Sequence, residues 1–337
     1  MTGFICLDKP EGITSFTAVN KLRRICGIKK AGHTGTLDPM ATGVLPVMLG
    51  GATKFSDFIP THDKAYEADI LLGVTTDTYD VTGNVLSKDD KKIGEDEFRA
   101  VLKEFVGETQ QLPPMYSAVS KDGVRLYKLA RQGISVEREK RNINIYSAEV
   151  LSASPEDGIF TVAVSCSAGT YIRSLANDIG EKLGCGAVLK KLRRTSANGF
   201  SLADSVTLEE LQKLKDEDRL HEAVKSVDSL FTEYGALTVS EAQAKRFMNG
   251  GALLKNRIRD LNGEGLFRVY SPEKKFLGLG SVKSEDDEMK IAKLLIDDGV
   301  TPLFPYKRPM TKEGFFKNTN TLMTNTMIAI FAQTIKS

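Results

Sequence analysis

The chain has 337 residues, a formal net charge of +2 and 41% hydrophobic residues. This length accommodates about two domains, and the composition is that of an ordinary globular protein. Four cysteines stand far apart without a C-x-x-C pair, and three histidines lack metal-ligand spacing, which argues against a disulfide framework and a zinc or histidine metal site. The N-terminus lacks a signal-type apolar core and no run reaches the roughly 18 apolar residues of a membrane span, so we expect a cytoplasmic protein without membrane contact.

Helices and strands are mixed along the first two thirds of the chain. Ser15 is typical of an N-cap with apolar residues at helical spacing behind it, and a second amphipathic pattern covers residues 95–106. Alternating apolar residues predict strands over 66–72 and 160–166, and another helix is expected to end at Gly184. Because no regular βαβ repeat is present, the pattern favours an α+β fold over a doubly wound sheet.

The pattern changes near residues 230–236, which predicts a domain boundary. A capped helix beginning at Ser240 is followed by short strands over 266–270 and 276–282, as is typical of a small β-rich domain. Residues 308–337 are mostly polar with a short apolar end, and we expect them to form a disordered tail.

Positive charge is concentrated in a few segments. Residues 121–141 hold seven basic against three acidic side chains, an excess of four, with Tyr127 among them. Four further cations surround two leucines over residues 189–194. Both segments suit a phosphate backbone. The cations between residues 21 and 30 fit a solvated helix face and a phosphate-contacting face equally well.

A single acid, Asp38, stands on a loop punctuated by glycine and proline and followed by an apolar run. The pattern suits a positioned carboxylate, but considered alone an Asp-Pro pair is more commonly a turn. The sequence shows no second acid nearby of the kind that glycosidase chemistry needs. The segment Gly32–Gly35 resembles a phosphate loop but lacks the G-K-[ST] ending, so nucleotide triphosphate binding is not expected.

Three other residues could contribute to a site. Tyr66 begins a predicted strand, and Tyr171 and Arg173 stand where a strand passes into a helix. A tyrosine offers a flat face for a base and a hydroxyl group, and an arginine can hold a carboxylate. Considered alone, each tyrosine is more commonly a packing residue.

Several short motifs follow one another along the chain. They are Leu7–Pro10 with Gly12–Ser15, Gly32–Pro39, Ala41–Pro46, Lys64–Tyr66, Pro114–Ala118, Gly169–Arg173 and Leu192–Arg194. By their number and order, these motifs resemble the TruB family of tRNA pseudouridine synthases, and the resemblance runs from Gly3 to about Arg308.

The resemblance implies roles for the matching residues. Asp38 stands in the place of the family's catalytic aspartate, which attacks the nucleoside and drives cleavage of the N1–C1′ bond. Tyr66 matches the tyrosine that stacks on the target base and is placed for proton transfer. Arg173 matches the arginine paired with the aspartate.

Other residues are implied in substrate binding. Tyr171 and Leu192 match residues that line the uracil pocket, and His33 matches a histidine that fills the space left by flipped bases. Lys9 belongs to an early Lys-Pro motif that we interpret as support for the active site. The cations expected on the RNA backbone are Arg125, Lys128, Arg131, Arg141, Lys191 and Arg193, with Lys255, Arg257 and Arg259 as further candidates.

The implied fold is a pseudouridine synthase catalytic domain over 1–232, with a mixed, mainly antiparallel sheet, flanking helices and a basic arm over 118–141. A small β-barrel PUA-like domain follows over 236–307. The implied function is isomerisation of uridine at position 55, in the T loop of tRNA, by a monomer without metal or other cofactor. The target must leave its stack, which costs a few kcal/mol. The alternative is a non-catalytic tRNA-binding or RNA-folding protein on the same scaffold.

Overall fold

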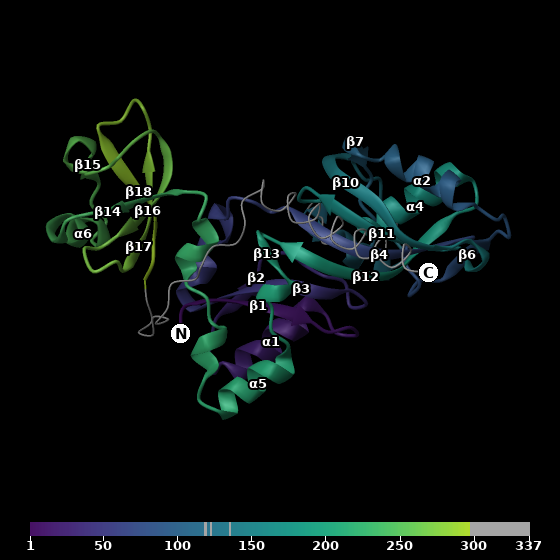
Figure 1. Ribbon diagram of the computed structural model, residues 1–337, viewed down its shortest axis with the longest axis horizontal. Coiled ribbons are helices and arrows are strands. Elements are labelled where there is room, and N and C mark those ends of the chain that lie inside the picture. Colours follow the sequence, from purple (N-terminus) through teal and green to yellow (C-terminus); the bar gives the residue numbers. More distant parts are fainter. Residues whose placement is uncertain (118–119, 122, 135, 297–337) are drawn as a thin grey trace, which may run out of the picture.

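The computed structural model describes residues 1–117, 120–121, 123–134 and 136–296. One large sheet with helices packed against it makes up the first two thirds of the chain, and a smaller sheet begins at Gly235 (Figure 1). The tail predicted over 308–337 lies outside the described residues.

The large sheet has nine strands in the order β1-β3-β12-β4-β11-β10-β7, with β2 beside β3 and β13 beside β12. Among the described strands of this sheet, only β3 and β12 pair in parallel, so the prediction of a mixed, mainly antiparallel sheet is confirmed. Its strands are β1 (Gly3–Lys9), β2 (Ala31–His33), β3 (Thr42–Leu49), β4 (Lys64–Leu72), β7 (Gly107–Gln111), β10 (Arg141–Ser154), β11 (Ile159–Cys166), β12 (Ala187–Ala197) and β13 (Phe200–Ser201).

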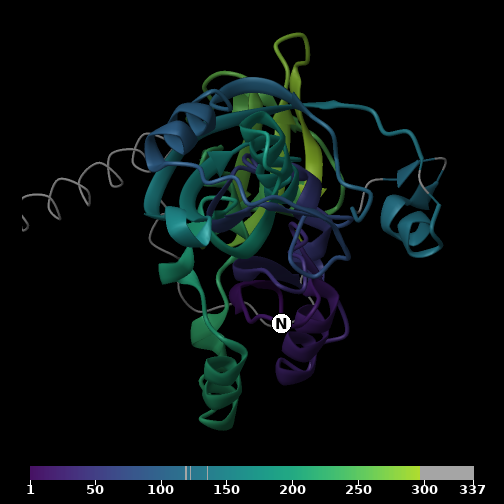
Figure 2. The same cartoon turned by 90° about the vertical axis from the view of Figure 1, so that its right-hand side faces the viewer.

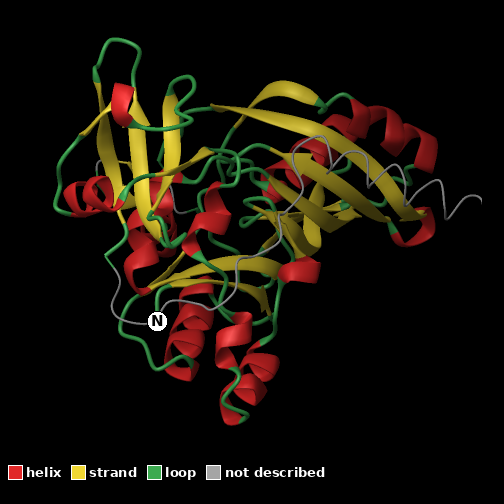
Figure 3. Cartoon of the chain, turned by 60° about the vertical axis from the view of Figure 1, so that its left-hand side comes forward, coloured by secondary structure: helices red, strands yellow, loops and turns green. Residues whose placement is uncertain are grey.

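Helices cover the sheet at two places (Figure 3). The helices α2 (Glu95–Lys103) and α4 (Ile172–Leu183) pack against the part formed by β10, β12 and β4. The helices α1 (Ser15–Ile25) and α5 (Leu208–Asp216) pack on each other beside β1 and β2. As predicted, α4 ends at Gly184, whose φ of 74° favours glycine.

The N-cap of α1 is Thr14, whereas the sequence analysis predicts Ser15. The hydroxyl of Thr14 accepts a hydrogen bond from the amide of Thr17 at 3.0 Å. Ser15 is buried, and its hydroxyl binds Leu37 on the loop that carries Asp38. The sequence pattern fits an N-cap at Thr14 or at Ser15, since both residues carry a hydroxyl group. The structure shows which of the two hydroxyls faces the helix end.

Alternating side chains on β1 feed two cores. Ile5 and Leu7 belong to the main core with α1 and α4, whereas Phe4 and Cys6 point to the opposite face. There they join a second core that includes Phe276 of the smaller sheet. This end of the large sheet is therefore buried on both faces, as the period of two along a strand allows.

The smaller sheet has five strands in the order β14-β16-β17-β18-β15. The helix α6 (Glu241–Met248) is capped by Ser240 and Gln243, which confirms the predicted capping box. Phe276 connects this sheet to the rest of the molecule, with ring centroids 6.1 Å from Phe55 and 6.4 Å from Phe231. The strands are β14 (Gly235–Thr238), β15 (Leu253–Leu254), β16 (Gly265–Tyr270), β17 (Phe276–Val282) and β18 (Glu288–Leu294).

Two excursions leave the large sheet. The hairpin of β5 (Val74–Thr76) and β6 (Val85–Lys88) follows β4. The predicted arm over 118–141 is described in part and extends away from the body of the molecule, carrying a short helix, α3 (Leu126–Arg131) (Figure 2). The other arm elements are the two-residue strands β8 (Ser120–Lys121) and β9 (Val124–Arg125).

Candidate active site

Asp38 lies on the loop between β2 and β3, and several contacts fix that loop. Ser15 Oγ accepts from the Leu37 amide at 2.8 Å and donates to its carbonyl at 3.0 Å. The Pro39 carbonyl accepts from the Gly12 amide at 2.8 Å. Asp38 also has its own carbonyl bonded to the Ala41 amide at 3.1 Å. The loop is a turn, as the residue pattern suggested, but it is a turn anchored to two other segments.

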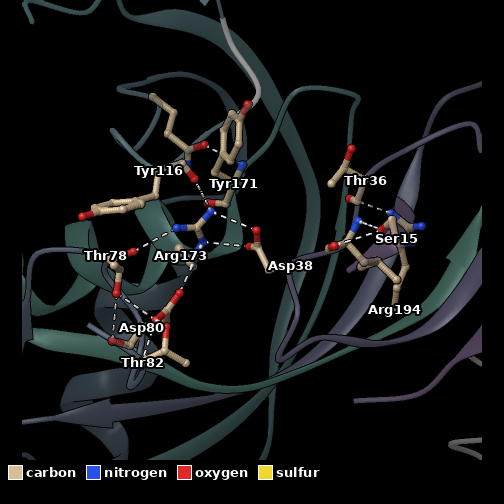
Figure 4. A network of polar contacts seen from close by, with 12 residues as sticks. Ser15, Thr36, Asp38, Thr78, Asp80, Thr82, Tyr116, Tyr171, Arg173 and Arg194 are labelled. Atoms are coloured by element: carbon tan, nitrogen blue, oxygen red, sulfur yellow. Dashed lines mark hydrogen bonds and ion pairs between the residues drawn. The ribbon is translucent and has the colours of Figure 1, made fainter. Parts of the chain in front are cut away.

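Arg173, in the first turn of α4, holds the carboxylate of Asp38 (Figure 4). Its Nε lies 2.9 Å from Asp38 Oδ2, and its Nη2 donates to Oδ1 at 3.2 Å. The same guanidinium donates to the Thr78 carbonyl at 3.0 Å and to the Tyr116 carbonyl at 2.8 Å. Two nitrogens on one carboxylate fix its orientation as well as its charge.

Asp80 is a second acid that the sequence interpretation missed. Its Oδ2 lies 3.7 Å from Arg173 Nε, and its side chain is 6% exposed. Three further bonds hold Oδ1, from the Thr78 hydroxyl and from the amide and hydroxyl of Thr82. The spacing of Thr78, Asp80 and Thr82 is a local sign of such a turn, but it does not reveal the contact with Arg173.

The carboxylate of Asp38 is more accessible than the side chains of Arg173 and Asp80. Its side chain is 35% exposed, against 5% for Arg173. Burial raises the pKa of Asp38, and the positive charge of Arg173 opposes that shift. The ion pair therefore favours a charged carboxylate at an opening of the protein surface.

Tyr66 lies on β4 and is 7% exposed. It is paired across the strands with Arg194 of β12. Burial raises the pKa of Tyr66 to about 12, so the phenol is neutral near pH 7. Leu192 belongs to the same apolar cluster as Tyr66.

Tyr171 directly precedes α4 and is held by Gln111 of β7. The Gln111 side chain accepts from the Tyr171 amide at 2.8 Å and donates to its carbonyl at 3.1 Å. Tyr171 lies beside Arg173 (Figure 4). Gln111 is buried and its role has no signal in the sequence, because glutamine fits an exposed strand edge equally well.

His33 ends β2 and is half-buried. Its Nδ1 is buried and has no hydrogen-bond partner among the described residues. Burial, and then the charge of Arg194, lower the pKa of His33. A neutral imidazole therefore stands at the start of the loop that leads to Asp38.

Lys9 is fully buried at the end of β1. Its ammonium group donates to the carbonyls of Pro10 at 2.7 Å, Ile13 at 2.8 Å and Pro39 at 3.3 Å. The acceptor at Pro39 is the residue next to Asp38, so this lysine connects the first strand to the candidate site.

The cations expected on RNA are spread over several surfaces. Arg141 begins β10 and Lys191 lies on β12, and both are exposed. Arg193 is half-buried and pairs with Asp8 at 2.7 Å. Arg125 ends β9 in the arm and is exposed. Lys128 and Arg131 belong to α3, and their side chains lie outside the described residues.

One member of the basic segment 190–194 is not a surface residue. Arg194 has an exposure of 0%, because the alternation of β12 turns it into the protein. The sequence predicts phosphate contacts for this segment, but Arg194 cannot make one because it is buried. In the part of the chain that the structure describes, no group of three acidic, histidine or cysteine side chains is arranged to hold a metal, and no helix is long and apolar enough to cross a membrane.

Three family models match the chain in succession. Residues 23–172 match the N-terminal domain of the TruB family of pseudouridylate synthases. Residues 173–232 match the C-terminal domain of tRNA pseudouridylate synthase B, and residues 235–287 match the C-terminal model of pseudouridine synthase II TruB.

Curated relatives cover the same region. The tRNA pseudouridine synthase B of Clostridium tetani is 46% identical over 298 residues, which are 88% of this chain and 100% of that protein. The protein of the same name from Pseudomonas fluorescens is also 46% identical, over 88% of this chain and 96% of its own length.

Solved structures share the fold. A Cbf5-Nop10-Gar1 complex matches with a TM-score of 0.67 and 27% identity, over 87% of this chain and 85% of that chain. An H/ACA RNP bound to a substrate RNA containing 2′-deoxyuridine matches with the same TM-score and 26% identity, over 89% of this chain and 87% of that chain.

Proposed function

Since the chain belongs to the TruB family of pseudouridylate synthases, we propose that it isomerises uridine to pseudouridine in tRNA, at position 55 of the T loop. The observation that carries this proposal is the pair formed by Asp38 and Arg173, with Nε 2.9 Å from Oδ2. The reaction needs an oriented, accessible carboxylate, as Asp38 provides, and a tyrosine, for which the buried Tyr66 is the candidate.

The reaction exchanges one bond for another at the ribose. The Asp38 carboxylate attacks C1′, and the N1–C1′ bonding pair leaves with the uracil. The detached base turns, C5 bonds to C1′ and displaces the carboxylate. The base loses its C5 proton and gains one at N1, so the product has the composition of the substrate. This balance requires no oxidant, nucleotide or metal.

The neighbours of Asp38 have separate tasks in this proposal. Arg173 orients the carboxylate, and its positive charge opposes the rise that burial causes in the pKa of Asp38. Tyr66 stacks on the base and is placed for the proton transfer at C5, while Tyr171 and Leu192 line the pocket that holds the free uracil. His33, neutral and short of one partner, fills the space that the flipped nucleotide leaves. A pocket that excludes water prevents loss of the base before it is reattached.

The rest of the chain binds the RNA. The arm and Lys191 supply cations for the phosphates. We propose that the sheet β14–β18 with α6 belongs to the PUA-like RNA-binding domain expected over 236–307, of which the structure describes residues 236–296. We place the enzyme in the cytoplasm as a monomer acting on the T stem-loop. A non-catalytic RNA-binding protein has no observation in its favour, because Asp38, Tyr66 and Arg173 are all present in the site.

The test uses a T stem-loop RNA that carries [5-³H]uridine, in buffer with a chelator and no cofactor. We expect tritium release equal to the amount of target uridine, because the C5 proton must leave. Asp38→Asn, which preserves the shape of the side chain, should bind the RNA but release less than one thousandth as much in the same time, in line with removal of a nucleophile. Full turnover by Asp38→Asn would exclude this mechanism.

A further inference from the structure

Arg194 is a fully buried arginine whose side chain has three carbonyl partners close to the candidate active site. Its Nε donates to the Val44 carbonyl at 2.7 Å. Its Nη2 donates to the Gly35 carbonyl at 3.1 Å, and its Nη1 lies 3.4 Å from the Thr36 carbonyl. Arg194 is also the cross-strand partner of Tyr66 on β4, so the two side chains lie on the same face of the sheet.

These contacts bracket the loop that carries Asp38. Gly35 and Thr36 precede that residue, and Val44 follows it on β3, so one guanidinium fixes both ends of the loop (Figure 4). The backbones approach closely as well: a Cβ on Gly43 would lie 2.2 Å from the Arg194 carbonyl oxygen. The strands β3 and β12 can pair here only because residue 43 is glycine.

The contact with Tyr66 has a direction. Arg194 and Tyr66 are neighbours across β12 and β4, and because a guanidinium has donors and no acceptor, a hydrogen bond between them runs from Arg194 to the Tyr66 oxygen. The hydroxyl proton of Tyr66 is then free to point elsewhere, and a phenolate formed during the reaction would have a cation in direct contact. Burial of a charge among uncharged acceptors is costly, and three carbonyls with a phenol are uncharged, which indicates a functional reason for this arginine.

We propose that Arg194 is a positioning residue for the isomerisation, which couples the loop of Asp38 to the hydroxyl of Tyr66. This inference rests on the proposed function. It assigns to Arg194 a role distinct from that of Arg173, since Arg173 contacts the nucleophile itself and Arg194 contacts the backbone on both sides of it. A role in binding phosphate is ruled out by its burial.

The chain offers a matched control. Ser15 holds the same loop at Leu37 through two hydrogen bonds and is buried like Arg194. Its described contacts are with the loop and not with Tyr66. A variant of Ser15 therefore loosens the loop alone, whereas a variant of Arg194 loosens the loop and releases the tyrosine.

The experiment is a pair of double-mutant cycles read by single-turnover rates at saturating RNA. Arg194→Lys keeps the charge but loses the fork geometry, and we expect a rate about 10–100-fold lower, with RNA affinity within threefold. The double variant that combines Arg194→Lys with Tyr66→Phe should react only slightly more slowly than the slower of the two single variants. The fold losses in rate of Ser15→Ala and Tyr66→Phe should instead multiply in the double variant.

Rates that multiply for Arg194→Lys and Tyr66→Phe would overturn the inference, as would an unchanged rate for Arg194→Lys. In both cases the proposed function would stand. Absence of pseudouridine from the unsubstituted protein would overturn the function and the inference together, so the two failures are distinct.

A second measurement covers the case in which Arg194→Lys does not fold. With ¹⁵N-labelled arginine, the slowly exchanging Nε–H signal of a buried arginine should shift in Tyr66→Phe. It should stay in place in Tyr146→Phe, since Tyr146 donates to Asp63 at 3.1 Å. No buried arginine signal that responds to Tyr66→Phe would contradict the coupling.

Discussion

The carboxylates of Asp38 and Asp80 contact the same guanidinium. Arg173 Nε lies 2.9 Å from Asp38 Oδ2 and 3.7 Å from Asp80 Oδ2. The near carboxylate is partly accessible, whereas the far one is buried in a turn that binds its other oxygen three times. Asp80 therefore holds Arg173 in place, and Arg173 orients the carboxylate of Asp38.

Replacement of Arg173 by methionine should shift the acid limb of the pH–rate profile to higher pH. Burial raises the pKa of Asp38 and Arg173 lowers it, so removal of the arginine leaves the upward shift unopposed and less carboxylate is present at a given acidic pH. We also expect a rate about 10²–10³-fold lower at the plateau. Single-turnover rates between pH 5 and 9 measure both effects.

Arg193→Met is the control for that profile, because Arg193 pairs with Asp8 on the same sheet. Its acid limb should coincide with that of the unsubstituted protein. An acid limb that does not move in Arg173→Met would mean that Asp38 is not the group that titrates.

Asp80→Asn should lower the single-turnover rate about 10–100-fold while RNA affinity stays within threefold. The amide keeps the shape of the turn at Thr78 and Thr82 but removes the charge beside Arg173, and a displaced Arg173 would misorient the carboxylate of Asp38. Asp77→Asn is the matched control, since Asp77 caps the same turn through Asn84 without contacting Arg173. Equal losses in the two variants would assign the effect to the turn.

Reversal of the charges at Arg125, Lys128 and Arg131 should weaken tRNA binding and flatten its salt dependence. Each phosphate contact contributes about 0.7–0.9 to the slope of log K against log salt, so loss of three contacts reduces the slope by about 2–3. Filter binding between 50 and 300 mM salt measures it. The same reversal at Lys88, Lys92 and Lys103, which are exposed near α2, is the control, and equal slopes for the two triple variants would remove the arm from RNA binding.

Phe276→Ala should lower the free energy of unfolding by about 3–5 kcal/mol, as for other buried phenylalanines. Phe276 packs against Phe55 and Phe231 in the core that joins the two sheets. Urea denaturation followed by circular dichroism measures the loss. Leu254→Ala, at a side chain that is 40% exposed, should change stability by less than about 0.5 kcal/mol. A similar loss in both variants would show that the joint core contributes little.

Elements with strong periodicity were predictable from the sequence. The helix after Tyr171 and its end at Gly184 were expected and observed, because apolar spacing and a C-terminal glycine act locally. The predicted N-cap of α1 was wrong by one residue, since Thr14 and Ser15 are both good N-cap residues. Ser15 is buried and binds Leu37, so the hydroxyl of Thr14 caps the helix.

Long-range contacts were not predictable in the same way. Asp80 was overlooked because its contact with Arg173 spans 93 residues of chain, and nothing local announces it. The sequence predicts that Arg194 is a surface cation, because three other cations directly precede it over residues 190–193. The alternation of β12 turns it inward, and only the pairing of β12 with β3 and β4 shows what it meets there.

The parallel pairing of β3 with β12 has a consequence for biosynthesis. Thr42 and Gly43 meet Arg193 and Arg194, so the loop of Asp38 gains its buried support about 150 residues after it leaves the ribosome. At about 5–20 residues per second, this interval lasts roughly 8–30 s. During that time the nascent chain carries Asp38 without the contacts that fix its loop, and we expect a fragment truncated before β12 to contain this loop but to form no pseudouridine.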